Sequence, residues 1–224
     1  MIMSDPTMLV EATTASGRCL SRNETGALVT RAARGAGFSW GLAEEAGFAA
    51  GWLARQGIDG AAIMLALLEK TVETSRAAMR PEVTPQGWQA VGQAPLCPIW
   101  LGAAILDGED GVQPLRARQV AHPALLLPFL ALLARDCGPL ALECGGLRVT
   151  IGAAGLAGDV SDLARLAVGD VMITRAGTFP TSAGELPQVA CRTISALDAL
   201  ALRTTVPASE ASRKGAGAAG DDND

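Results

Sequence analysis

Histidine is almost absent from this sequence, and so is lysine. The 224 residues contain a single histidine, His122, and two lysines, Lys70 and Lys214. A hydrolase triad could therefore use only this one imidazole, and a metal site would have to rely on carboxylates. We expect no metal centre, and the residue types assign no cofactor.

The sequence also lacks any pair of cysteines in the spacing of a zinc knuckle or a redox motif. Its five cysteines are scattered and odd in number, which argues against a disulfide framework. Buried thiols in a reducing compartment fit this pattern better. The cysteines are Cys19, Cys97, Cys137, Cys144 and Cys191.

Long apolar runs and basic surface are missing too. The most apolar stretches, 95–106 and 123–134, are shorter than the roughly 20 residues that cross a bilayer. The first residues lack the basic and apolar regions of a secretory signal, so we expect a soluble, cytoplasmic protein without membrane contact. A net charge of −5 and a pI near 5.0 argue against nucleic-acid binding.

Enough apolar sequence is present for a folded core, because 49% of the residues are hydrophobic and 18% are charged. In the first third, Ser21 and Glu24 form a capping-box pattern that predicts a helix over 22–33. Ser39 and Asp59 are placed to cap two more helices, over 40–55 and 60–71. The glycines inside the second helix indicate close packing against a neighbouring helix.

The pattern after residue 71 is mixed. Prolines and glycines predict an irregular connection over 71–93. Strands are predicted over 99–106, 114–121, 171–175 and 188–193, with a hairpin over 140–151. Helices are predicted over 123–136, interrupted by Pro128, over 159–166, and over 196–203 after a cap at Ser195.

These elements predict an α+β fold: an N-terminal helical unit followed by a mixed or antiparallel β-rich region with a few packed helices. We divide the chain into a leader (1–19), a helical unit (20–72), an α+β region (73–205) and a polar tail (206–224). We expect the helical unit and the α+β region to form one compact domain.

Several stretches resemble a family of uncharacterised proteobacterial proteins, a domain of unknown function. The resemblance rests on the sequences Ala-Arg-Gly-Ala-Gly at 33–37, Trp-Gly-Leu-Ala-Glu-Glu-Ala-Gly at 40–47, Leu-Leu-Leu-Pro-Phe-Leu at 125–130, Val-Pro-Ala-Ser-Glu-Ala-Ser-Arg at 206–213, and the Gly-Ala-Gly and Asp-Asn-Asp of the C-terminal tail. It implies no catalytic residues. It places the protein among those of bacterial small-molecule metabolism.

The turn at 34–37 is the first candidate site. Glycines beside a serine-capped helix start can expose backbone N–H groups to an anion, and an arginine could add a bidentate contact. The alternative is a tight connection between two helices, and no nucleotide-binding fingerprint is present. The residues concerned are Arg34, Gly35, Gly37, Ser39, Trp40 and Glu44.

His122 and the C-terminal tail are the other candidates. His122 precedes Pro123 at a strand-to-helix junction, where it could act in a site or simply satisfy its surroundings. The tail is polar enough to be solvated, yet it could fold into a pocket or dock on a partner. Its candidate residues are Ser209, Glu210, Ser212 and Arg213.

Two functions remain open from these residues. The first is binding of an anionic small molecule, as a binding protein or an enzyme of catabolic metabolism. The second is a non-catalytic accessory or scaffold subunit that binds a metabolic enzyme through the apolar helices or the tail. The sequence leaves open whether the protein is an enzyme, and it leaves the oligomeric state open.

Overall fold

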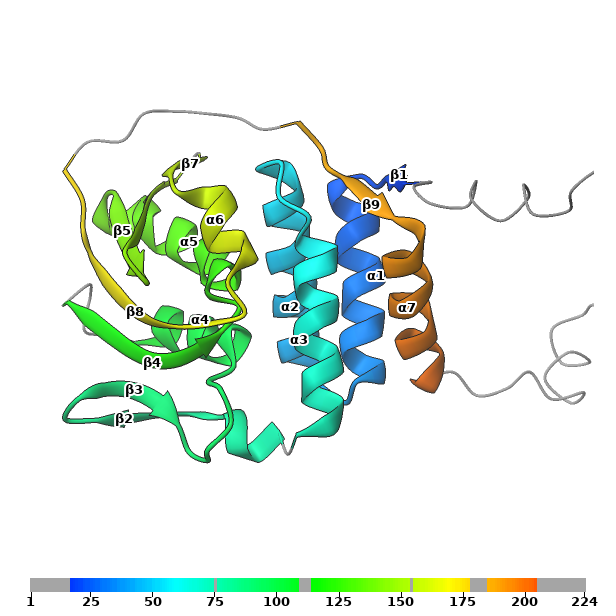
Figure 1. The fold of residues 1–224 in the computed structure, drawn as a ribbon, viewed down its shortest axis with the longest axis horizontal. Helices are drawn as coiled ribbons and strands as arrows, with labels where there is room; N and C mark the ends of the chain where they lie inside the picture. Colours follow the sequence, from blue (N-terminus) through cyan, green and yellow to red (C-terminus); the bar gives the residue numbers. More distant parts are fainter. Residues whose placement is uncertain (1–16, 75, 109–113, 154, 178–184, 205–224) are drawn as a thin grey trace, which may run out of the picture.

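A group of helices stands beside a mixed β-sheet in the computed structural model (Figure 1), which describes residues 17–74, 76–108, 114–153, 155–177 and 185–204. This arrangement confirms the expected α+β class. The α-helices of these residues are α1 (Arg22–Gly35), α2 (Trp40–Arg55), α3 (Gly60–Glu73), α4 (Pro98–Asp107), α5 (Leu127–Cys137), α6 (Val160–Arg165) and α7 (Cys191–Ala201). Short 3-10 helices add η2 (Arg76–Met79), η3 (Pro123–Leu126) and η4 (Leu202–Thr204).

The larger sheet has the strand order β2-β3-β4-β8-β5-β6-β7. Only the β3–β4 pair is parallel, and the other neighbours are antiparallel. A separate ribbon pairs β1 with β9. The strands are β1 (Gly17–Cys19), β2 (Pro81–Thr84), β3 (Gly87–Ala90), β4 (Leu115–Ala121), β5 (Leu140–Cys144), β6 (Leu147–Gly152), β7 (Gly155–Gly158), β8 (Val168–Arg175) and β9 (Gln188–Ala190).

The first three helices begin where their capping residues predict. Ser21 and Glu24 form a complete capping box, while Ser39 and Asp59 each accept a hydrogen bond from a backbone N–H in the first turn. Close packing explains the glycines of α2, because a Cβ on Gly47 would lie 2.7 Å from the carbonyl oxygen of Gly26 on α1. Helix α1 thus approaches α2 at backbone distance.

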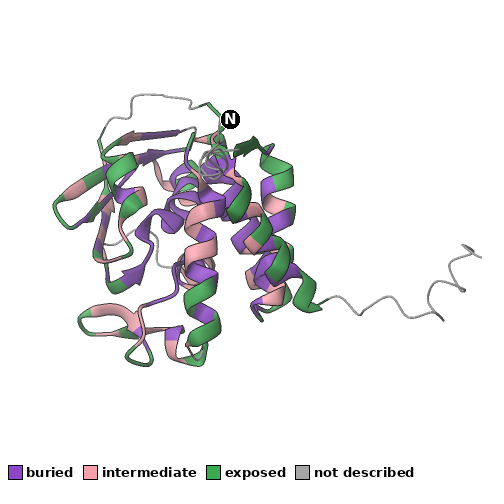
Figure 2. Cartoon of the chain, turned by 45° about the vertical axis from the view of Figure 1, so that its right-hand side comes forward, coloured by how far each residue is buried: buried purple, intermediate pink, exposed green. Residues whose placement is uncertain are grey.

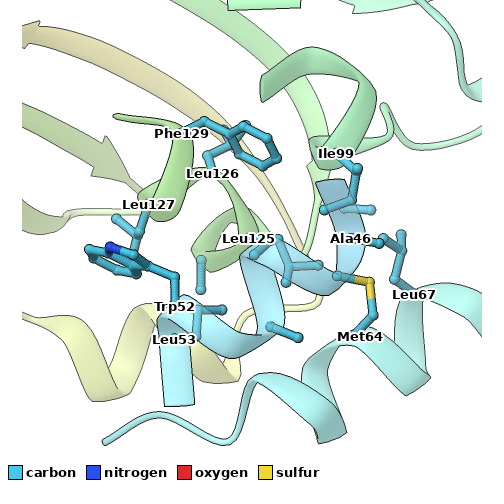
Figure 3. Close-up of a cluster of buried hydrophobic side chains, with 14 of the residues drawn as sticks. Ala46, Trp52, Leu53, Met64, Leu67, Ile99, Leu125, Leu126, Leu127 and Phe129 are labelled. Atoms are coloured by element: carbon cyan, nitrogen blue, oxygen red, sulfur yellow. The ribbon is translucent and has the colours of Figure 1, made fainter. Parts of the chain in front are cut away.

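Helix α2 links the two parts of the protein. It contacts α1 and α3 on one side and α4 and α5 on the other. Figure 3 shows the side chains that meet there, with Leu53 of α2 and Met64 of α3 near Leu125 of η3. One cluster of buried apolar side chains therefore extends from the helices to the sheet. In Figure 2 the helices are buried where they face one another and the sheet, and exposed on their outer sides.

The predicted strand over 99–106 is wrong, since these residues form α4. A short, continuously apolar run carries no periodicity that separates a buried strand from a buried helix. Pro98 occupies the first turn of α4, where its missing N–H costs nothing. Gly102 gives the ring of Phe129 room, because a Cβ there would lie 2.3 Å from the ring.

Two other boundaries differ from the prediction. The segment after α3 was expected to be an irregular connection, but it contains η2 and the β2–β3 hairpin. Helix α7 begins at Cys191, so Ser195 lies inside the helix and does not cap it. The prediction that Ser195 caps this helix is therefore wrong. The predicted hairpin over 140–151, the helix break near Pro128 and the short helix α6 are confirmed.

Candidate functional site

The turn between α1 and α2 holds its arginine within the protein. The guanidinium of Arg34 donates a hydrogen bond to the carbonyl of Phe38 and lies 4.5 Å from the ring centre of Trp40. A second arginine, Arg76 of η2, donates to the carbonyl of Ala36 at 3.1 Å. Gly37 has a φ of +91°, which favours glycine. These contacts hold the tight turn that separates α1 from α2.

The other residues of this turn also have local structural roles. A Cβ on Gly35 would lie 1.6 Å from the carbonyl oxygen of Leu200, so this glycine permits the approach of α7. The Ser39 hydroxyl accepts from the N–H of Leu42 at 3.4 Å, and Glu44 is exposed. Anion binding at this turn stays a prediction. The candidate residues of the C-terminal tail lie outside the described residues; they are Ser209, Glu210, Ser212 and Arg213.

The cysteines do not form disulfides in the described chain. Cys97 and Cys144 are buried as expected, and burial raises the pKa of the Cys97 thiol to about 11. The expectation of buried thiols is wrong for Cys19 and Cys191, which are exposed near the β1–β9 ribbon. A two-stranded ribbon as short as β1–β9 contacts too few other elements to bury every side chain.

His122 joins β4 to η3 with an unusual backbone. Its φ and ψ are 42° and 68°, a left-handed conformation that costs a residue other than glycine of order 1 to 3 kcal/mol. Pro123 disfavours the right-handed helical conformation at the preceding residue. Two hydrogen bonds stabilise the junction: the N–H of His122 donates to Ala167 at 2.8 Å, and its carbonyl accepts from Leu125 at 2.9 Å.

His122 is buried, with 9% of the residue exposed, and one ring nitrogen lacks a hydrogen-bond partner within the described residues. The Leu166 backbone raises the pKa of His122. Nε2 has no hydrogen-bond partner among the residues that the structure describes. An unpaired buried polar group costs about 1 to 3 kcal/mol. Nε2 is therefore a buried nitrogen that lacks a partner in this part of the chain.

His122 lines a cavity between α3 and the sheet. Lys70 and Thr74, at the C-terminal end of α3, line it from one side, and Met79 and Ala167 line it as well. The space in which water-sized groups fit measures about 40 Å³. This is room for about three non-hydrogen atoms, since one water needs about 10 to 15 Å³ on this measure.

Lys70 supplies the charge at this cavity. Burial lowers the pKa of His122, and the Lys70 ammonium lowers it further, so the imidazole is neutral at pH 7. The Lys70 side chain is exposed, and within the described ranges no carboxylate pairs with it. Neither Lys70 nor Thr74 was a candidate from the sequence. The rarity of lysine was the available signal, but nothing in the pattern linked Lys70 with His122.

We expect His122 to make the protein less stable in mild acid. Its folded pKa lies below the unfolded value of about 6.5, so the unfolded chain takes up the proton first as the pH falls. The stability associated with the neutral ring is present above pH 6.5 and is lost as the pH falls toward the folded pKa, by at most about 1.4 kcal/mol per pH unit.

This pH effect can be isolated with His122→Asn, because asparagine tolerates the left-handed backbone. Urea unfolding of both proteins at about pH 7.5 and about pH 5.5 gives the difference in unfolding free energy. The wild type should lose more stability than the variant between the two pH values. Equal losses would contradict the role assigned to this ring.

The comparisons with known proteins bear on the first part of the chain, from α1 to the β2–β3 hairpin. Residues 20–96 match the model of a family described as proteins of unknown function (DUF3726). The match confirms the expected resemblance to an uncharacterised family. It includes the Arg34 turn and Lys70, while His122 lies beyond it. No curated protein and no solved structure matches the chain.

Among the helices of the described residues, none is both long enough and apolar enough to cross a bilayer.

Proposed function

We propose that this protein binds a small organic anion in the cavity between Lys70 and His122. The observation that carries the proposal is a cavity lined by both His122 and Lys70. The buried Nε2 of His122 has no hydrogen-bond partner among the described residues, and no carboxylate of these residues pairs with Lys70. Buried polar groups are nearly always hydrogen-bonded, so an unsatisfied one on a residue that lines a cavity calls for a partner, which a ligand can supply.

Charge and size narrow the class of ligand. The positive charge of Lys70 attracts anions and disfavours a metal cation at the neutral imidazole. A space of about 40 Å³ admits one end of a small molecule and excludes a nucleotide or another large cofactor. The left-handed backbone at His122 is a further sign, because costly conformations cluster at binding sites.

The alternative role, a non-catalytic accessory subunit, would use the apolar helices to bind a partner. The apolar residues of α1, α2 and α3 contribute to the protein's own buried core. A partner surface would therefore have to be formed by other residues. The cavity is the better-supported site, and whether binding is followed by a reaction is a separate question.

The binding proposal can be tested by NMR on the untagged full-length chain labelled in histidine, because His122 is its sole histidine. We expect at least one anion from a panel of acetate, glycolate, 3-hydroxypropanoate and phosphate to shift the imidazole resonances in a saturable manner. Lys70→Gln should weaken this binding about tenfold, which corresponds to the loss of one charge-assisted contact.

Arg55→Gln is the matched control, because Arg55 is an exposed cation at the C-terminal end of another helix, α2. This variant should bind like the wild type. If no anion of the panel gives a saturable shift, or if both variants weaken binding equally, the cavity is not an anion site.

A further inference from the structure

We propose that the acidic end of the polar tail, Asp-Asp-Asn-Asp at 221–224, docks on the turn between α1 and α2, where the guanidiniums of Arg34 and Arg76 lie. This contact is made within one chain and does not depend on the binding proposed for the cavity at Lys70. Three features of the described residues support it: the two guanidiniums, the exposed ring of Trp40, and the place where the chain leaves α7.

Two arginine side chains lie on this one turn. The guanidinium of Arg34 donates a hydrogen bond to the carbonyl of Phe38. The guanidinium of Arg76 donates to the carbonyl of Ala36, and it lies so close to Gly37 that a Cβ there would collide with it. The two acceptors thus stand on either side of one glycine. Like charges on the same turn repel each other, so an anion that contacts both would stabilise them.

Both guanidiniums keep hydrogen-bond donors for such an anion. Each has five N–H groups, and the carbonyl contacts of the turn use one on each arginine. Within the described ranges, no carboxylate lies close enough to Arg34 or Arg76 to form an ion pair. The start of α2 adds positive partial charge to the same turn. Carboxylates suit these donors, because arginine binds them in a bidentate geometry.

Trp40 indicates a peptide rather than a small anion. It is 67% exposed, and the guanidinium of Arg34 lies 4.5 Å from the centre of its ring. Tryptophan and arginine are enriched among the residues that contribute most to contacts between protein surfaces. An inorganic anion would leave this ring in water, whereas a peptide segment can cover it while its carboxylates meet the arginines.

The tail starts beside the turn. Helix α7 packs on α1, and the carbonyl of Leu200 lies against Gly35, next to Arg34. The described chain leaves η4 at Thr204, and residues 205–220 join it to the acids. A linker that spans about 3.3 Å per extended residue reaches the turn easily. Such a tether holds the acids at an effective concentration of about a millimolar, so a contact that is weak between separate molecules suffices.

The test is NMR on the untagged, ¹⁵N-labelled full-length chain at low salt. Changing Asp221, Asp222 and Asp224 together to Asn should shift the indole N–H resonance of Trp40, which Trp40→Phe identifies. In the wild type the ¹H–¹⁵N NOE of the amides at 221–224 should be positive. Arg76→Gln should lower it to zero or below, and so should about 0.5 M NaCl, which screens exposed charges.

Arg80→Gln is the matched control, because Arg80 is an exposed arginine just after η2, and its loss removes the same charge. This variant should keep the positive NOE. Equal losses in Arg76→Gln and Arg80→Gln would contradict docking on this turn. An unchanged Trp40 resonance in the tail variant would overturn the proposal even if Arg76→Gln fails to fold.

Two further outcomes would assign the turn to another ligand and would also overturn the proposal. The first is a tail NOE that rises with protein concentration, which indicates docking on a second copy of the chain. The second is a saturable shift of the Trp40 resonance by inorganic phosphate in a wild type whose tail NOE is negative. That result would identify the turn as a site for small anions.

Discussion

Replacing Gly35 with alanine is expected to lower the free energy of unfolding by about 2 to 3 kcal/mol. The backbone at Gly35 is helical, so alanine is conformationally allowed there. The loss comes from sterics, because the new Cβ would lie 1.6 Å from the carbonyl oxygen of Leu200. Helix α7 would have to move away from α1, and part of the burial of Leu197 and Leu200 would be lost.

The matched control is Gly41→Ala, in the first turns of α2. Nothing lies within 4 Å of a Cβ at this position, and the residue is exposed. Alanine should therefore stabilise the protein by about 0.5 to 1 kcal/mol, through the higher helix propensity of alanine. Urea unfolding measures both variants. If Gly35→Ala is as stable as Gly41→Ala, α7 does not pack on α1 at backbone distance.

The second large effect is expected for Phe129→Ala, which should cost about 3 to 5 kcal/mol. Phe129 is fully buried on α5, and its ring meets that of Phe48 edge to face at a centroid distance of 6.0 Å. Truncation removes these contacts and leaves a cavity between α2, α4 and α5. For a chain of this length, such a loss lowers the melting temperature by roughly 6 to 20 °C.

Gly102 provides a test of the same contact from the opposite side. In the wild type, Gly102→Ala should destabilise the protein, since its Cβ would lie 2.3 Å from the Phe129 ring. In the Phe129→Ala background the ring is gone, so the same substitution should be neutral or stabilising. This coupling distinguishes a specific overlap from a general intolerance of α4. Additive free energies in the double variant would contradict the packing described here.

The helical part of the fold was predictable because its signals are local. Ser21, Ser39 and Asp59 act on N–H groups within the next three residues, so the chain alone reveals where these helices begin. Helix α4 and the β2–β3 hairpin were missed because their conformations depend on distant partners. Phe129 covers α4, and β3 pairs with β4 across a gap in sequence.

The candidate site was predictable only in part. His122 stood out as the sole histidine, next to a proline at a junction, and the structure places it beside a cavity. Its partner Lys70 is far away in sequence, and no periodicity or spacing relates the two. For the Arg34 turn, the sequence predicted a candidate anion site from its glycines and its arginine. The contacts that these residues make in the structure, with Phe38, Trp40 and α7, are contacts within the helical packing.

The cavity is assembled from two segments that meet only after folding, the end of α3 and the junction after β4. Neither segment forms the site alone, so a ligand held there has no affinity for the unfolded chain. By mass action, a ligand at a hundred times its dissociation constant would then add about 2.7 kcal/mol to the stability. Under the proposed function, the abundance of this protein in a cell would follow the concentration of such a ligand, because ligand-free chains would unfold and be degraded more often.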